Sequence, residues 1–154
     1  MSGENYRAFI EQLLAETGRG PERTIAILQG LQRQYRHLPE EAWAAAVPGL
    51  PRKTIRMLAG HLHNARCTWL ETLGRPHGIP VPAAVDRRSV SRRELIAALA
   101  ASGRGIEALL DLGCRRGGEV PATPAYAWRN LPLDVGHVLA YFVAHEGHHR
   151  GQIV

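Results

Sequence analysis

The sequence predicts an all-α protein, a four-helix bundle with long crossover loops. Apolar residues recur at intervals of three and four along four long stretches, which is the period of an amphipathic helix. No series of alternating apolar and polar residues predicts a half-buried strand, and prolines and glycines gather between the helical stretches. Long helices are expected at about residues 22–38, 52–73, 91–112 and 133–154.

The chain is predicted to begin with a short helix and a linker, over residues 1–20. Pro21 then opens the first long helix, because proline fits the first helical position, and this helix closes near Pro39. Residues 40–50 are expected to form one or two helical turns around Trp43, followed by a loop.

The second long helix is expected to start at Arg52 and to stop at Gly74. Residues 74–90 contain three prolines, so we expect a loop there. Ser91 is a favourable N-cap for the third helix, and Glu94 three residues later completes a capping box.

The third helix contains Ser-Gly-Arg-Gly at residues 102–105, a candidate kink or interruption. A second long loop is expected over residues 113–130, and Asp134 caps or enters the last helix. Both loops are well beyond a tight turn. They leave room for parallel or non-adjacent helix neighbours in the bundle.

The length and composition indicate a single domain, residues 1–154. The sequence shows no apolar run of about 18 residues that could span a bilayer, and no secretory signal at its start. Cys67 and Cys114 lie far apart and outside any C-x-x-C motif, which favours reduced thiols. We therefore expect a cytoplasmic protein that does not bind membranes, with Cys67 as a small core residue.

The formal net charge is +5, but the basic residues are scattered. The closest clusters are three arginine pairs: Arg87-Arg88, Arg92-Arg93 and Arg115-Arg116. A nucleic-acid surface typically shows a basic stripe with interleaved aromatic residues, and neither feature is present. Solvated helix faces explain these charges, and nucleic acid is not an expected partner.

The last ten residues contain the most distinctive pattern of the chain, His-Glu-Gly-His-His-Arg-Gly-Gln-Ile-Val. His145 and His149 are four apart on a predicted helix, so they point the same way and can share one transition-metal ion. His61 and His63, on the second long helix, are the candidates for a third ligand. Two positions apart, they face different directions; His61 is expected to be the ligand, with His63 as its rival. The other candidates, rejected on position, are His37, His77 and His137.

Two segments resemble the DinB/YfiT-like metal-binding superfamily. They are His-Leu-His-Asn-Ala-Arg-Cys-Thr-Trp-Leu from His61 and His-Glu-Gly-His-His-Arg-Gly-Gln from His145. The resemblance implies an up-down-down-up four-helix bundle with a three-histidine site for zinc or nickel. It places the ligands at His61, His145 and His149, and leaves His148 out. Tyr141 departs from the histidine or polar residue that members often carry there, so its role stays open.

Characterised members of this superfamily include S-transferases and isomerases that use a low-molecular-weight thiol. The resemblance therefore implies a divalent metal ion that activates such a thiol, or water, for attack on a small-molecule electrophile. Three histidine ligands also leave a coordination position open, as catalytic sites do. We also expect a homodimer, since bundles with exposed apolar helix edges often dimerise.

Three alternatives remain. One is a non-catalytic metal-binding or stress-response module, and another is that these histidines bind no metal at all. The third is an H-E-x-x-H metallohydrolase, in which Glu146 would be the general base. Such sites normally take their third ligand downstream of the motif, where only five residues follow His149.

Overall fold

The computed structural model describes residues 37–124 and 131–152. Within these ranges the chain is mostly helical, which agrees with the predicted all-α class. The short helix expected within residues 1–20 and the long helix expected at 22–38 lie outside the described residues, apart from a turn at residues 37–38. No helix in the described part of the chain is both long enough and apolar enough to cross a membrane.

The described part opens with a 3-10 helix, η1 (Glu40–Ala44), at the helical turn that the sequence predicted around Trp43, and the side chain of Trp43 is buried. A small antiparallel hairpin follows, formed by β1 (Ala46–Val47) and β2 (Leu50–Thr54), with Gly49 at φ 73° in its turn. The predicted helix start at Arg52 is therefore wrong. Residues 51–53 are exposed and add no apolar contact to a helix, so the helical pattern begins only at Ile55.

Helix α3 (Ile55–Trp69) begins where the Thr54 hydroxyl accepts a hydrogen bond from the amide of Met57, 3.2 Å away. It continues into a π-helical turn, η2 (Leu70–Gly74), and a 3-10 turn, η3 (Arg75–His77). Gly78 closes this segment at φ 77°, a left-handed conformation that suits glycine. The regular α-helix therefore ends at Trp69, five residues before the predicted stop at Gly74, and the π-helical turn covers the difference.

Helix α4 (Arg92–Arg115) starts with the predicted capping box, in which Ser91 and Glu94 exchange hydrogen bonds. The expected interruption at residues 102–105 is absent, and the helix runs through them. A Cβ atom at Gly105 would lie 2.5 Å from Leu70 Cδ1, so the glycine allows the two helices to approach closely. Packing therefore offsets the low helix propensity of this segment.

Helix α5 (Val135–Gly151) is capped by Asp134, whose carboxylate accepts a hydrogen bond from the amide of His137 at 2.9 Å. Just before it, Val120 N–H donates to the carbonyl of Leu133, and the amide of Val135 donates to the carbonyl of Gly118. These bonds hold the two ends of the second long loop together.

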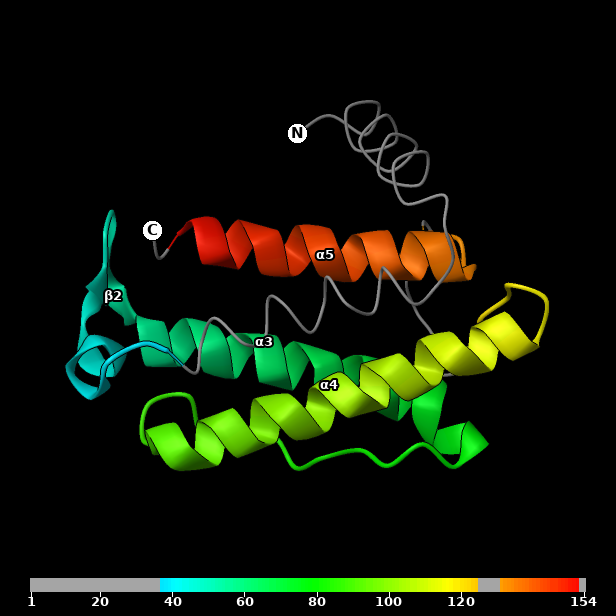
Figure 1. Ribbon diagram of the computed structural model, residues 1–154, viewed down its shortest axis with the longest axis horizontal. Helices are drawn as coiled ribbons and strands as arrows, with labels where there is room; N and C mark the ends of the chain where they lie inside the picture. The colour runs from blue at the N-terminus through cyan, green and yellow to red at the C-terminus, as the bar shows by residue number, and fades with distance from the viewer. Residues whose placement is uncertain (1–36, 125–130, 153–154) are drawn as a thin grey trace.

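Helices α3 and α4 run in the same direction and α5 runs the opposite way (Figure 1). The loop between α3 and α4 returns along the length of the helices to make this parallel arrangement. These directions are those of the last three helices in an up-down-down-up bundle. The helix predicted at 22–38, which would complete it, lies outside the described residues.

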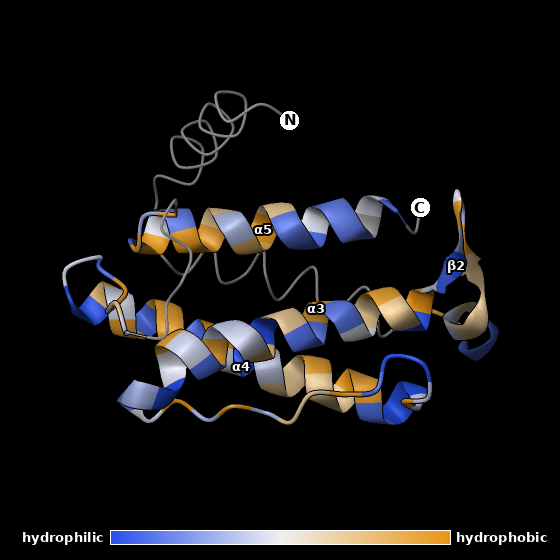
Figure 2. Ribbon diagram, turned by 180° about the vertical axis from the view of Figure 1, so that it is seen from behind, coloured by the Kyte–Doolittle hydropathy of each residue, from blue (hydrophilic) through white to orange (hydrophobic). Residues whose placement is uncertain are grey.

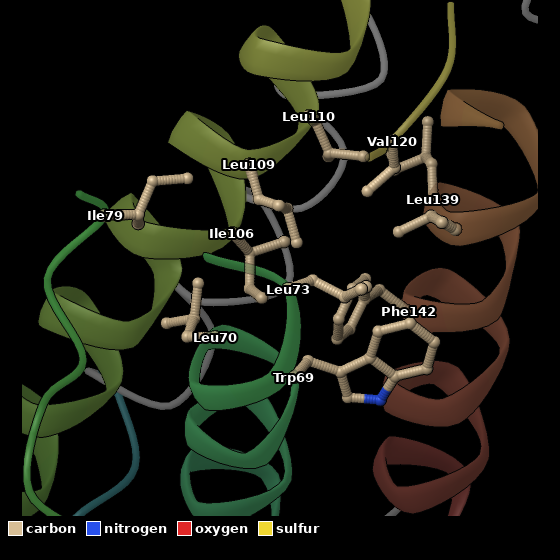
Figure 3. Close-up of a cluster of buried hydrophobic side chains, with 11 residues drawn as sticks. Trp69, Leu70, Leu73, Ile79, Ile106, Leu109, Leu110, Val120, Leu139 and Phe142 are labelled. Atoms are coloured by element: carbon tan, nitrogen blue, oxygen red, sulfur yellow. The ribbon is translucent and has the colours of Figure 1, made fainter. Parts of the chain in front are cut away.

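The largest cluster of buried apolar side chains lies between the three helices around Trp69 and Phe142, whose ring centroids are 5.3 Å apart (Figure 3). It takes in the beginning of α5. The same helix is hydrophobic at its beginning and hydrophilic toward its end (Figure 2). The histidine-rich end of α5 therefore lies beyond this cluster, at the end of the molecule where α3 begins and the hairpin stands (Figure 1). Two smaller apolar clusters, around Trp43 and Val47, include residues from the first half of α3.

Candidate metal site

His61 of α3 meets His145 and His149 of α5. The ring centroid of His61 lies 5.3 Å from that of His145 and 4.8 Å from that of His149, and the latter two are 4.7 Å apart. One ring nitrogen from each residue falls within 4.8 Å of the others. All three side chains are partly buried. The structure thus brings together the three histidines that the sequence pattern and the resemblance single out.

The donor set fits a divalent transition metal. Zinc bound to imidazole nitrogens at about 2.0–2.1 Å in a tetrahedral arrangement holds those nitrogens about 3.3 Å apart. The three nitrogens here are within 4.8 Å of one another, so small side-chain rotations bring them onto one ion. Imidazole suits zinc, nickel and copper, whereas magnesium and calcium prefer oxygen ligands.

The surroundings keep these imidazoles neutral. Burial is the main cause that lowers the pKa of His145, to about 4, and the neighbouring His149 and His61 lower it further. Burial likewise lowers the pKa of His61 and of His149. A neutral imidazole has a free lone pair, so the three side chains are in the protonation state that metal binding requires.

Gln152 orients one member of the cluster. The Nδ1–H of His149 donates a hydrogen bond to Gln152 Oε1 at 2.8 Å, which leaves its Nε2 lone pair free. Metal-binding histidines usually donate their second nitrogen to an outer partner in this way. The Gln152 amide also donates to Nε2 of His148 at 3.2 Å; His148 is exposed and stands outside the cluster.

His63, the rival of His61, is a core residue. Its side chain is fully buried, and its Nε2–H donates to the carbonyl of Ala83 at 2.9 Å. Its Nδ1 accepts from the hydroxyl of Ser102 at 3.0 Å, and burial lowers the pKa of the ring. Both nitrogens are therefore engaged by α4 and the preceding loop, and neither is available to the cluster.

A buried ion pair joins the two helices that carry the cluster. Nε and Nη2 of Arg66 lie 2.7 and 2.6 Å from Glu146 Oε1, and each side chain is only 3% exposed. Nη1 of Arg66 also donates to the carbonyl of Leu99, so the same guanidinium contacts α4. Burial raises the pKa of Glu146, and Arg66 opposes this shift. Oε1 of Glu146 is bound to Arg66, and Oε2 is buried without a hydrogen-bond partner among the described residues. A carboxylate buried in this way between α3 and α5 is poorly placed to act as the general base of an H-E-x-x-H site.

Tyr141, whose role the sequence left open, supports His145. The two rings are stacked, with centroids 5.7 Å apart and planes 5° from parallel. Trp69 packs against Tyr141, and their ring centroids are 4.8 Å apart. An aromatic series therefore runs from the apolar core to the histidine cluster and restricts the rotation of His145.

The remaining histidines are elsewhere. His37 is exposed, and the ring of His137 contacts the Asp134 carboxylate, as expected of residues outside the cluster. His77, expected at the surface, is partly buried. None of these three belongs to the group of converging ligand atoms.

Other residues of the two motifs have plainer roles. Cys67 is 6% exposed and its Sγ lies 3.4 Å from Nε2 of His63, which agrees with the predicted core residue. Within the described part of the chain, no atom lies within 4 Å of a Cβ built at Gly147 or Gly151. None of the described helices therefore approaches these glycines closely, and the side chain of Arg150 lies outside the described ones.

Sequence reasoning missed two cations near the cluster, Lys53 and Arg87. Both lower the pKa of His61, after burial and His149. Lys53 lies in a strand and Arg87 in a loop, so no helical period connects either residue to His61. Gly60 is the one available signal, because a buried glycine within a helix often marks a close approach by another segment.

Comparison with known proteins agrees with the geometry. A sequence model of the DinB superfamily matches residues 16–153, which include α3, α4, α5 and all three converging histidines. No curated protein and no solved structure matches the chain significantly. The family match covers most of the chain, and the described helices agree with the all-α fold expected from it. This protein belongs to the DinB superfamily.

Proposed function

We propose that the protein binds one divalent transition-metal ion, zinc or nickel, through His61, His145 and His149. The convergence of three neutral imidazoles from two helices is the observation that carries this proposal. The natural occupant of the space between three converging imidazole nitrogens is a metal ion.

We further propose that the site is catalytic and of the thiol S-transferase or isomerase type. Three protein ligands leave a position open for a small molecule, whereas structural zinc sites are closed by a fourth protein ligand. A divalent ion held there supplies Lewis-acid chemistry, which lowers the pKa of a thiol or water that binds in the open position.

The residues of the chain then have distinct tasks. The three histidines hold the ion, and Gln152 keeps Nε2 of His149 free for it. The Arg66–Glu146 pair keeps α3 and α5 in register. Glu146 is committed to this pair, which favours thiol activation over hydrolysis: a thiol of lowered pKa ionises without a general base, whereas an H-E-x-x-H hydrolase needs its glutamate.

The complete fold is proposed to be the up-down-down-up bundle, with the helix predicted at 22–38 as its first member. The directions of α3, α4 and α5 support this arrangement (Figure 1).

Metal content tests the proposal. Protein purified without added metal, or reconstituted with zinc or nickel, should contain about one ion per chain by elemental analysis. His61→Ala should remove it. His148→Ala is the matched control: it deletes an exposed neighbouring imidazole outside the cluster and should leave the content unchanged. Protein that takes up neither metal would refute the site.

Activity is tested next on the loaded protein. Conjugation of a small electrophile with low-molecular-weight thiols should be faster with loaded wild type than with the His61→Ala variant. Loaded protein that conjugates no cellular thiol would identify the chain as a metal-binding module without this activity.

A further inference from the structure

The converging histidines are not all held in the same way. The Nδ1–H of His149 donates a hydrogen bond to Gln152, which is how an outer partner usually fixes a metal-binding imidazole. His145 has no such partner within the described part of the chain, where neither of its ring nitrogens takes part in a hydrogen bond. Its ring instead stacks against Tyr141, with planes 5° from parallel and centroids 5.7 Å apart.

Tyr141 is itself held from the opposite helix. It precedes His145 by four residues on α5, so the two rings lie one turn apart along that helix. The ring of Trp69 on α3 packs against it, with centroids 4.8 Å apart. Trp69 is 2% exposed and also packs against Phe142, 5.3 Å away, in the largest apolar cluster (Figure 3). The Tyr141 ring therefore lies between a buried core side chain and a candidate metal ligand.

The same two helices provide both ends of this aromatic series and the candidate ligands. On α3, Trp69 follows His61 by eight residues, about two turns. His61 lies 5.3 Å from His145, and Trp69 lies 4.8 Å from Tyr141, so α3 and α5 meet through rings at two successive levels. The contact at the level of Trp69 therefore sets the position of the Tyr141 ring against which His145 stacks.

We propose that Tyr141 is a positioning residue for the metal site. Its ring, held by Trp69, takes the place of a hydrogen-bonding outer partner and keeps the His145 imidazole turned toward His61 and His149. The inference rests on the proposed function, because it concerns a ligand of the proposed ion. A ligand that is already ordered before the ion binds loses less side-chain entropy on binding, so the stack raises metal affinity. The aromatic ring of Tyr141 has this effect, and its hydroxyl takes no part.

The test measures zinc affinity by competition with a chromogenic chelator in wild type, Tyr141→Leu and Tyr141→Phe. Leucine keeps an apolar side chain but removes the flat ring, so Tyr141→Leu should weaken zinc binding by about three- to tenfold, the scale of immobilising one side chain. Tyr141→Phe keeps the ring and should bind zinc as tightly as wild type. Unchanged affinity in Tyr141→Leu would overturn the proposal, and so would an equal loss in Tyr141→Phe, because it would assign the effect to the hydroxyl.

Phe142→Leu is the matched control. It removes the ring adjacent to Tyr141 in sequence, which packs against the same Trp69 and lies outside the group of converging ligands. Phe142 is 1% exposed, so this variant should lower the free energy of unfolding and leave zinc affinity unchanged. Equal losses of zinc affinity in Phe142→Leu and Tyr141→Leu would show a general loosening of the core and overturn the proposal.

The orientation of His145 is also measured without metal. NMR relaxation of isotope-labelled histidine rings should show lower order for His145 in metal-free Tyr141→Leu than in wild type. The His149 ring, held by Gln152, should keep its order in both proteins. Equal order for His145 in the two proteins would overturn the proposal. Wild-type protein that takes up no zinc would instead contradict the proposed function, and the ring measurement would still decide whether Tyr141 positions His145.

Discussion

Arg66 and Glu146 form an ion pair across the interface of α3 and α5, with Nη2 2.6 Å from Oε1 and both side chains 3% exposed. The pair lies next to the candidate site in sequence on both helices: Arg66 is five residues after His61, and Glu146 directly follows His145. An ion pair this buried is a poor source of net stability, because desolvation offsets most of the attraction. Its value lies in the register that it imposes on the two helices.

Removing one partner of the Arg66–Glu146 pair should lower the free energy of unfolding more than removing both partners. Glu146→Ala leaves the Arg66 guanidinium buried without its counter-charge and should destabilise the fold by about 3–5 kcal/mol. The double variant Arg66→Met/Glu146→Leu replaces the pair by apolar groups and should recover most of that loss. Urea unfolding of the metal-free proteins measures both changes. Equal destabilisation in the single and double variants would contradict this account of the pair.

The same glutamate distinguishes thiol activation from hydrolysis. Glu146→Gln keeps an oxygen that can accept from Arg66, so metal content should stay at about one ion per chain and thiol conjugation should persist. Wild-type protein should not cleave peptides, because the Glu146 carboxylate is bound to Arg66. Peptide cleavage that disappears in Glu146→Gln, with metal content intact, would establish the H-E-x-x-H alternative.

His61→Ala should reduce metal affinity, whereas His63→Ala should reduce the stability of the fold. Loss of an outer-shell partner costs 10- to 100-fold in metal affinity, so loss of the His61 ligand should cost about 100-fold or more. His63→Ala should keep the affinity but lower the free energy of unfolding by about 2–4 kcal/mol, because it leaves a cavity and removes the donor to the carbonyl of Ala83. Metal titration and urea unfolding of both variants measure this; metal loss in His63→Ala alone would reassign the ligand.

Local signals in the sequence predicted much of the described helical framework. The Ser91–Glu94 capping box is a short-range interaction, and the structure shows it where the sequence places it. The four-residue spacing of His145 and His149 is a property of any α-helix, so their shared face follows once α5 forms. His61 and His63 differ by two positions, so the same helical geometry predicts that only one of them can face α5. The hydrogen bonds that bury His63 come from residues distant in the sequence.

Features that depend on contacts between distant segments escaped the sequence. The continuity of α4 at residues 102–105 depends on Leu70 packing at Gly105, which no local propensity reveals. The position of Arg87 over Gly60 depends on a long loop held by hydrogen bonds. The hairpin before α3 lacks the alternating pattern of a half-buried strand, since most of β2 is exposed.

The two cysteines should differ in reactivity. Cys67 is 6% exposed and burial raises the pKa of its thiol, so little of the reactive thiolate forms at neutral pH. Cys114 is partly exposed. A disulfide reagent should label one thiol per chain quickly in native protein and the second only in denaturant. Cys114→Ser should abolish the fast reaction and Cys67→Ser should retain it; the reverse would contradict the core assignment of Cys67.

Metal-free protein should lose stability as the pH falls from about 7 toward 5. The pKa of His145 is about 4 in the folded protein and about 6.5 in the unfolded chain. Between these values the unfolded chain binds the proton and the folded protein does not, so acidification favours unfolding. The lowered pKa values of His61 and His149 act in the same direction. The free energy of unfolding should therefore be highest above pH 6.5, where the rings are neutral in both states, and should decline as the pH falls from 6.5 toward 4.

Urea unfolding of metal-free protein at pH 7.5, 6.5 and 5.5 measures this slope. His145→Gln should make it shallower, because glutamine takes up no proton in either state, whereas His37→Gln removes an exposed histidine outside the cluster and should leave it unchanged. Glu146, whose pKa burial raises, and His63, whose pKa burial lowers, are present in both proteins, so the difference between wild type and His145→Gln reports the imidazole of residue 145. Stability that is flat or rises on acidification would show that His145 is not held neutral by its burial.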